Sequence, residues 1–242
     1  NQGEGDPDYH LTDDAFKPYR KGEKAADAQI LLFPGFICGW KANNDAEPIM
    51  GLLGRNGSDF SAAIVGASLR SSRVEFWTDV DGIYTADPRI VPDAIMVNDM
   101  SYEEAMELSF FGSKVLHPKT LAPLAAKGIE AWSLNSMNPS SRGTRITSGR
   151  FESSGPIRGI SCLKDTAMIS VSGSGMKGKS GMAARIFAAV SRAGISMLLI
   201  TQSSSEYTIS FCVPQKDALT VQEILSSEFE LELRENIINL IE

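Results

Sequence analysis

The sequence has little cysteine and almost no histidine. Its 242 residues include three cysteines, Cys38, Cys162 and Cys212, and two histidines, His10 and His117. The cysteines are far apart, odd in number and without Cys-x-x-Cys spacing, which argues against a disulfide framework. So few potential ligands also argue against a zinc cluster. We therefore expect free thiols in a reducing compartment such as the cytoplasm, with no resident metal and no prosthetic group.

Long apolar runs and an excess of positive charge are also missing. No apolar run reaches the roughly 18 residues typical of a membrane-spanning helix, and the opening residues NQGEGDPDYH lack a signal-peptide layout. Lys and Arg total 23 against 30 Asp and Glu, a net charge of −7. An acidic chain is poorly suited to duplex DNA or to an anionic membrane surface. We expect neither a nucleic-acid nor a membrane partner, although a local basic pocket for phosphate remains compatible with this charge.

The composition is that of a globular protein with room for two domains. Hydrophobic residues make up 43% and charged residues 22%, and 242 residues accommodate one large domain or two ordinary ones. Residues 1–28 are polar and predict a loop. Residues 138–158 are dense in Ser, Gly, Arg and Pro and mark a break. We therefore predict a first domain over 1–150 and a second over 155–242.

The first domain alternates predicted strands and helices. A cap at Ser58 and a capping box formed by Ser101 and Glu104 mark two helix starts. This order predicts an α/β domain with a largely parallel sheet. The expected strands cover 30–38 (buried), 48–53, 74–78 and 129–134, and the expected helices cover 58–69, 101–110 and 118–127.

The second domain has a different rhythm. Its predicted order is strand, helix, strand, strand, helix, strand, which is typical of an α+β ferredoxin-like sandwich. The expected strands cover 167–171, 196–202, 207–213 and 237–241, and the expected helices cover 179–193 and 217–236.

Two loops of the first domain carry candidate chemistry. Gly54–Asp59 (GRNGSD) follows a strand and opens a helix, where glycines allow close approach and free N–H groups favour an anion. Arg55 adds a guanidinium that fits a carboxylate or a phosphate. The same residues also fit a tight turn at Asn56–Gly57 with Ser58 and Asp59 as helix caps.

The second loop follows the strand 74–78. It begins with Thr78 and Asp79 and continues through Asp81, Tyr84 and Arg89. Ligands of open α/β sheets bind beyond the carboxyl ends of strands, where Tyr84 offers a flat face to a base and Arg89 a cation to a phosphate. A solvated acidic turn is the alternative interpretation of this segment.

Three long motifs, in this order, resemble the aspartokinase branch of the amino-acid kinase family: LGRNGSDFSAA, FWTDVDGIYTADPR and SYEEAMELSFFGSKVLHPKT. The later segment SGSGMKGKSGMAARIFAAVSRAGISMLLITQSSSEYTISFCV resembles that family's regulatory ACT domain. The resemblance covers about residues 30–242 and is strongest to threonine-sensitive bifunctional aspartokinase–homoserine dehydrogenases. It implies part of an amino-acid-kinase sheet sandwich with helices on both faces, followed by an ACT domain.

The resemblance implies transfer of a phosphoryl group from ATP, with Mg²⁺, to the β-carboxylate of aspartate, the first step toward Thr, Met and Lys. Arg55 would hold the α-carboxylate of aspartate together with Asn56, Gly57 and Ser58, and Asp59 would organise the transferring site. The implied ATP-binding residues are Thr78, Asp79, Tyr84, Arg89, Lys114 and Val115.

The resemblance also implies feedback control by a free amino acid, with threonine favoured over lysine. ACT domains usually pair edge strand to edge strand, which implies a homo-oligomer. The implied effector-binding residues are Met176, Gly178, Gly181, Met182, Ile200 and Gln202.

The sequence departs from the family pattern in one respect. The family's KFGGTS-type turn, whose lysine stabilises the transferring phosphate, does not occur in these 242 residues, and neither does a dehydrogenase GxGxxG loop, so NADP is implied only for a parent that carries a dehydrogenase. We expect a fragment without useful kinase activity, in the cytoplasm, or in a plastid if the parent is from a plant.

The alternatives are an amino-acid sensor or dimerisation module with a degenerate kinase lobe, and another small-molecule kinase such as an acetylglutamate or uridylate kinase. The latter enzymes lack a fused ACT domain.

Overall fold

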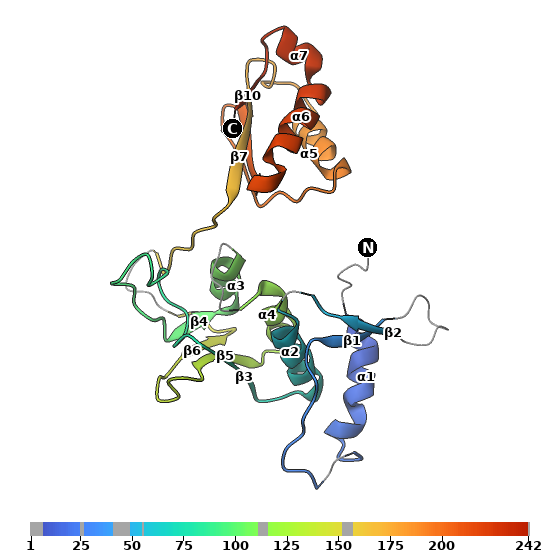
Figure 1. Cartoon of the computed structure of the whole chain (residues 1–242), viewed down its shortest axis with the longest axis vertical. Helices are drawn as coiled ribbons and strands as arrows, with labels where there is room; N and C mark the ends of the chain where they lie inside the picture. The colour runs from blue at the N-terminus through green and yellow to red at the C-terminus, as the bar shows by residue number, and fades with distance from the viewer. Residues whose placement is uncertain are drawn as a thin grey trace. The chain divides into compact units, whose positions relative to one another are not determined.

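The computed structural model describes residues 7–24, 27–40, 49–54, 56–110, 116–151 and 157–241. Arg55, Lys114 and Val115, three of the predicted site residues, lie outside these ranges. The chain forms two compact units that divide between Cys162 and Leu163, and each unit has its own sheet and helices (Figure 1). None of the helices in the described ranges has the length and apolar character needed to cross a bilayer.

The first unit contains a mixed four-stranded sheet of order β3-β5-β6-β4 and a separate antiparallel hairpin of β1 and β2. β3 is parallel to β5 and β4 to β6, whereas β5 and β6 are antiparallel, so the prediction of a largely parallel sheet is confirmed, with one antiparallel pairing. Its elements are α1 (Tyr9–Arg20), β1 (Ile37–Trp40), β2 (Ile49–Leu52), α2 (Gly57–Leu69), β3 (Arg73–Thr78), β4 (Asp99–Ser101), α3 (Tyr102–Phe110), α4 (Pro118–Ala125), β5 (Glu130–Asn135) and β6 (Thr144–Thr147).

The core of this unit lies between the sheet and the helices α2, α3 and α4. Val74 and Phe76 alternate with exposed or half-buried residues along β3, as a strand with one buried face should. They pack with Leu121 and Leu124 of α4 in one buried cluster. On the opposite face of β3, the side chain of Trp77 is 51% exposed. The predicted α/β layering is confirmed.

The expectation of a loop over 1–28 was wrong, because this segment contains α1. Asp8 caps the helix by accepting a hydrogen bond from the backbone N–H of Leu11. Arg20 fixes α1 to its neighbour by donating to the carboxylate of Asp13 and to the carbonyl of Ser68 in α2. The polar composition and Pro18 conceal a helix that Arg20 ties to α2 and whose Phe16 and Tyr19 rings contact Phe33.

The buried strand expected over 30–38 was also wrong. Ile30 and Leu32 are 87% and 94% exposed, and only Ile37 and Cys38 of that range belong to a strand, β1. Pro34 has no N–H to donate, and Phe36 adopts a left-handed φ of 72°, so the backbone cannot continue a strand through this point. The strand expected over 48–53 is confirmed as β2.

The break expected over 138–158 contains a strand, β6, which pairs with both β5 and β4. Gly143 makes the return from β5 possible. Its φ is 73°, and a Cβ there would lie 2.4 Å from the carbonyl oxygen of Ser133. Only glycine can adopt this conformation with so close an approach. A stretch whose composition resembles a linker therefore forms the connection between β5 and β6.

The two predicted caps had opposite outcomes. The capping box is confirmed, since Glu104 accepts from the Ser101 N–H at 2.8 Å and Ser101 Oγ accepts from the Glu104 N–H at 3.1 Å. The cap at Ser58 was wrong, because α2 already begins at Gly57 after Asn56, and no side chain caps that end. Asn56 is left-handed but Gly57 is helical, which excludes the alternative two-residue turn, because that turn needs positive φ at both residues.

The second unit confirms the ferredoxin-like prediction. Its antiparallel sheet has the order β10-β7-β9-β8, and α5 and α6 pack on it around a core that includes Ile169, Phe211 and Leu225. α5 begins at Met182, not at residue 179, after left-handed Gly181. The elements are β7 (Thr166–Ser172), α5 (Met182–Arg192), β8 (Leu199–Gln202), β9 (Thr208–Pro214), a short 3-10 turn (Gln215–Asp217), α6 (Ala218–Glu228), α7 (Glu230–Arg234) and β10 (Asn239–Ile241).

The single helix expected over 217–236 was wrong, because it breaks at Phe229 between α6 and α7. The ring of Phe229 is fully buried, and the guanidinium of Arg185 lies over it at 4.3 Å. Arg185 also donates to the carbonyl oxygen of Glu228, at 2.8 Å. Burial of the ring and capture of this carbonyl by α5 fix the bend.

Candidate functional site

The loop before α2 is held in a tight, specific conformation. Gly54 and Asn56 both have positive φ, 79° and 58°, and the Gly57 N–H donates to the Gly54 carbonyl at 3.1 Å. Gly57, Ser58 and Asp59 therefore present the first turn of α2, whose N–H groups have no partners within a helix. This is the arrangement that the sequence predicted for an anionic ligand.

A second segment, Gly35–Phe36, lies against this turn. Ser61 Oγ donates to the Gly57 carbonyl and accepts from the Phe36 N–H, both at 2.8 Å. Gly35 lies close enough that a Cβ on it would be 3.5 Å from Ser58 Cα. The sequence did not assign Phe36 or Ser61 to the site, because their contribution depends on a contact between residues 25 positions apart.

Asp59 is the half-buried acid of the site. Burial raises the pKa of its carboxyl above the usual value, because a partly desolvated carboxylate loses hydration. A carboxylate left short of hydration in the first turn of a helix is suited to receive a cation or an ammonium group.

The carboxyl ends of β3 and β5 form the second part of the site. The strands are parallel neighbours with Thr78 opposite Asn135. The loop that follows β3 is fixed to the end of β5, because the N–H and the hydroxyl of Ser136 both donate to the Thr78 carbonyl, at 2.8 and 2.9 Å. Thr78 Oγ1 in turn donates to Asp79, whose side chain is exposed.

Arg89 and Tyr84 lie farther along the same loop. Arg89 makes a two-point contact with Asp87, through Nε at 2.9 Å and a terminal nitrogen at 2.8 Å. Hydrogen bonding to Asp87 raises the pKa of Arg89, so its charge is permanent. Tyr84 is half-buried and forms an isolated bridge to Met96, which leaves part of the ring accessible.

Three residues of this region were missed by the sequence analysis. Asn135 ends β5, and Ser136 and Asn138 follow it. The side-chain amides of Asn135 and Asn138 both donate to one oxygen of Asp81, at 2.7 Å and 3.1 Å. The signal for them was the polar run SLNSMN at the end of a predicted strand. Only the structure assigns this run to the site, because β5 pairs with β3 and so places the run beside the loop that follows β3.

His117, to which we assigned no chemistry, has a structural role. Its Nδ1 accepts from the Lys119 N–H at 3.1 Å and caps α4.

In the second unit, the glycine-rich turn precedes α5. Gly178 and Gly181 both have positive φ, 68° and 88°, and no side chain caps the helix after Gly181. Met176 and Met182 flank the turn, but both side chains belong to the buried core, so only their backbone is available to a ligand. Ile200 and Gln202 lie on the exposed edge strand β8.

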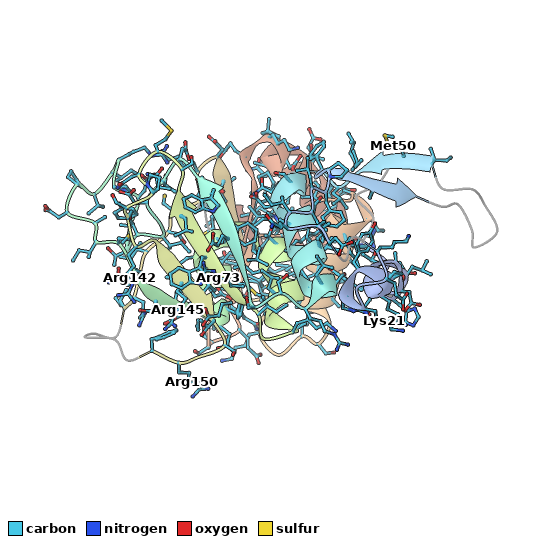
Figure 2. The ribbon with its side chains drawn as sticks, turned by 90° about the horizontal axis from the view of Figure 1, so that it is seen from below. Lys21, Met50, Arg73, Arg142, Arg145 and Arg150 are labelled. Carbon is cyan, nitrogen blue, oxygen red and sulfur yellow. The ribbon has the colours of Figure 1, made fainter. Side chains whose placement is uncertain are left out.

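A surface cavity lies apart from these loops. It has a volume of about 620 Å³ and is lined by Lys17, Arg20, Lys21, Leu69 and Arg70, and Figure 2 shows Lys21 beside α1. It contains none of the predicted site residues. Within the described ranges, no group of three or more His, Cys, Asp or Glu side chains is arranged to hold a metal ion.

Two parts of the chain match known protein families. Residues 9–135, more than half of the chain, match the amino acid kinase family. The chain belongs to this family. Residues 169–229 of this amino acid kinase chain match an ACT domain. Both parts of the predicted resemblance are therefore confirmed.

A curated relative of this amino acid kinase is the bifunctional aspartokinase/homoserine dehydrogenase of Haemophilus influenzae. It is 50% identical over 217 residues, which cover 90% of this chain but 26% of the relative. The chain thus spans about a quarter of that relative's length.

Two solved structures of aspartokinase III from E. coli are similar to the whole fold. The complex with lysine and aspartate, in the T-state, has a TM-score of 0.71 at 29% identity and covers 98% of this chain and 50% of that one. The complex with aspartate and ADP, in the R-state, has a TM-score of 0.65 at 31% identity, with coverages of 86% and 45%.

Proposed function

We propose that this chain is part of an aspartate kinase, which transfers the terminal phosphoryl group of ATP to the β-carboxylate of aspartate. In this proposal residues 1–150 are a portion of the catalytic domain and residues 155–242 are a regulatory ACT domain. One observation carries the proposal: the uncapped first turn of α2 and the loop after β3, which bears Arg89, occur in a chain that is 50% identical over 217 residues to a bifunctional aspartokinase/homoserine dehydrogenase.

The aspartate site is proposed at the start of α2. The N–H group of Ser58, together with Asn56, Gly57 and Arg55, would bind the α-carboxylate, because a helix start favours an anion and a guanidinium fits a carboxylate. Asp59 would orient the transferring groups.

The ATP site is proposed at the carboxyl ends of β3 and β5. Thr78 and Asp79 start the loop, Tyr84 offers a ring to the base, and Arg89 carries a fixed positive charge for the phosphates. Lys114 and Val115 complete the proposed set. Phosphoryl transfer depends mainly on positioning and charge neutralisation. Mg²⁺ would enter with ATP and compensate its phosphate charges.

Regulation is proposed at the glycine-rich turn before α5. The free N–H groups after Gly181 suit the carboxylate of a free amino acid. Met176, Gly178 and Met182 would contribute backbone groups, and Ile200 and Gln202 would contribute from β8. Threonine is the proposed effector, ahead of lysine. Exposed β8 provides a free edge for pairing with a second copy, since all four of its residues are exposed.

The compartment proposed is the cytoplasm, or a plastid if the source is a plant. The three cysteines are free thiols, which agrees with a reducing environment.

A thermal-shift titration of the 242-residue chain with aspartate, ATP–Mg²⁺, threonine and lysine tests these assignments. A ligand that binds only the folded state raises the melting temperature. We expect shifts with ATP–Mg²⁺ and aspartate from the first unit and with threonine from the second. No shift with either ATP–Mg²⁺ or aspartate would contradict the kinase proposal.

A second candidate is an amino-acid sensor with a degenerate kinase lobe. It is favoured by the match of residues 169–229 to an ACT domain. A threonine shift without any ATP shift would support the sensor. Turnover in a coupled assay for ADP formation with aspartate would exclude the degenerate lobe. We expect no turnover from this chain by itself, so the ATP–Mg²⁺ and aspartate shifts decide between the two candidates.

A further inference from the structure

We propose that Asp81 is a positioning residue, which fixes the ATP-binding loop 78–89 on the end of β5 through Asn135 and Asn138. This inference rests on the proposed function, because it assigns a role to a residue within the proposed ATP site. Asp81 is not in the set of ATP-binding residues above. Its carboxylate is engaged with the protein through one oxygen that accepts from two amides.

The geometry determines which way each of these groups faces. Asn135 Oδ1 accepts from the Met137 N–H at 2.8 Å. The amide nitrogen of Asn135 must therefore point the other way, toward Asp81, where it donates at 2.7 Å. Because Asn138 donates to the same oxygen, at 3.1 Å, position 81 requires a hydrogen-bond acceptor.

The Asp81 contact is one of several hydrogen bonds that hold the loop. The Thr78 carbonyl is held by Ser136 at the start of the loop. Beyond Asp81, the Ile83 N–H donates to Thr144 Oγ1 at 2.8 Å, and this hydroxyl donates to the Val97 carbonyl at 2.6 Å. Asp81 contributes a carboxylate oxygen where Thr78 and Val97 contribute carbonyl oxygens and Thr144 a hydroxyl, and hydrogen bonds to a carboxylate are stronger than those to a neutral acceptor.

The consequence concerns ATP and not aspartate. The proposed ATP contacts Asp79, Tyr84 and Arg89 all lie on the loop that Asp81 fixes, whereas the proposed aspartate site is at the start of α2. Loss of the acceptor at position 81 would loosen the loop between its anchors at Thr78 and Ile83, and ATP would then have to order this part on binding, which lowers affinity. Asn135 is almost fully buried, so its released amide would also lack a partner.

The test is a calorimetric titration of ATP–Mg²⁺ and of aspartate into the wild-type chain and matched variants. We expect Asp81→Ala to weaken ATP binding about tenfold, in line with the loss of a charge-assisted hydrogen bond, with aspartate binding unchanged. Asp81→Asn retains an acceptor oxygen, so it should keep most of the ATP affinity. Asp93→Ala removes an exposed acid from the region just after the same loop and serves as the matched control.

A charge exchange sharpens the test. Asn135→Asp places two carboxylates together and should weaken ATP binding, whereas the double variant Asp81→Asn with Asn135→Asp restores a donor–acceptor pair and should recover it. Hydrogen exchange of the amides of 79–85, measured without nucleotide, should accelerate in Asp81→Ala and not in Asp93→Ala.

Each outcome has a distinct meaning. ATP affinity of Asp81→Ala equal to wild type, or unchanged exchange of 79–85, would overturn the positioning role and leave the ATP site standing. Equal weakening by Asp81→Asn and Asp81→Ala would overturn the acceptor role in favour of a direct role for the charge. A parallel loss of aspartate affinity would indicate general unfolding of the unit and also overturn the proposal. If the wild-type chain binds no ATP, the proposed ATP site fails, and this inference fails with it.

Discussion

The ring of Phe36 lies directly against Gly57, so closely that a Cβ added to Gly57 would be 2.6 Å from Phe36 Cδ2. Gly57 is the first residue of α2 and is buried. Phe36, which precedes the β1–β2 hairpin, therefore packs tightly against the proposed aspartate-binding turn. Glycine is required at position 57 because a side chain there would collide with the Phe36 ring, and not because of its backbone angles.

We expect Gly57→Ala to lower the free energy of unfolding by about 1–2 kcal/mol, the usual range for overpacking after a small gain in helix propensity. Aspartate affinity should fall with it, because the turn must shift. Urea unfolding and aspartate titration measure the two effects. In a Phe36→Ala background the same substitution should cost less, and equal costs in both backgrounds would show that the ring is not the obstacle.

Asp59 should be a site where stability and binding oppose each other. Burial raises the pKa of its carboxyl in the folded state, so the folded chain binds a proton more readily than the unfolded one. The associated stability is present at acid pH and is lost as pH rises from about 4 through the raised pKa. Asp59→Asn should therefore raise the melting temperature at pH 7 but not in acid, while ligand binding is lost. A lower melting temperature at pH 7 would contradict this.

Ionisation of Tyr102 should destabilise the first unit at alkaline pH. Its hydroxyl donates to the Ile129 carbonyl, and burial, with a smaller effect of Glu130, raises the pKa of Tyr102 from 10.0 to about 12. The unfolded chain ionises first as pH rises, so stability should fall between pH 10 and pH 12.

Tyr102→Phe removes this pH dependence and, at pH 7, should cost about 1–2 kcal/mol, because the Ile129 carbonyl loses its buried donor. Urea unfolding at pH 7 and pH 11 separates the two effects. The same slope against pH in both proteins would assign the alkaline loss to another group.

Arg185 should hold the bend between α6 and α7. It contacts Glu232 at 2.6 Å and Glu228 at 3.1 Å and lies over the Phe229 ring. Because the guanidinium is partly exposed, we expect Arg185→Ala to cost about 1 kcal/mol in the second unit. Arg185→Lys should recover little of it, since an ammonium lacks the planar fork.

The dependence of the second unit's stability on pH in the acid range also tests this contact. Hydrogen bonding from Arg185 lowers the pKa of Glu232, so its contribution is present above about pH 4.5 and is lost as pH falls through the lowered value. Arg185→Ala should flatten the acid side of the stability profile. An unchanged acid limb would mean that Glu232 does not report on this contact.

Much of the fold was predictable because it rests on local patterns. The capping box of Ser101 and Glu104 and the strand 74–78 are read from neighbouring residues, and both are confirmed. The same holds for the order of elements in the second unit. The wrong predictions share a different cause. α1 depends on an arginine that reaches α2, and β6 depends on Gly143 against Ser133, contacts that no local window contains.

The sequence by itself determined the family, most of the element types and the glycine-rich turns, because motifs and periodicity are local properties of the chain. Only the tertiary structure decided that Phe36 lies against Gly57 and that Asn135 and Asn138 face Asp81. These relationships need β3 and β5 to be parallel neighbours and the segment around Phe36 to lie beside α2. They arise from burial of the apolar faces of the strands and helices, which brings distant residues together irrespective of their own sequence context.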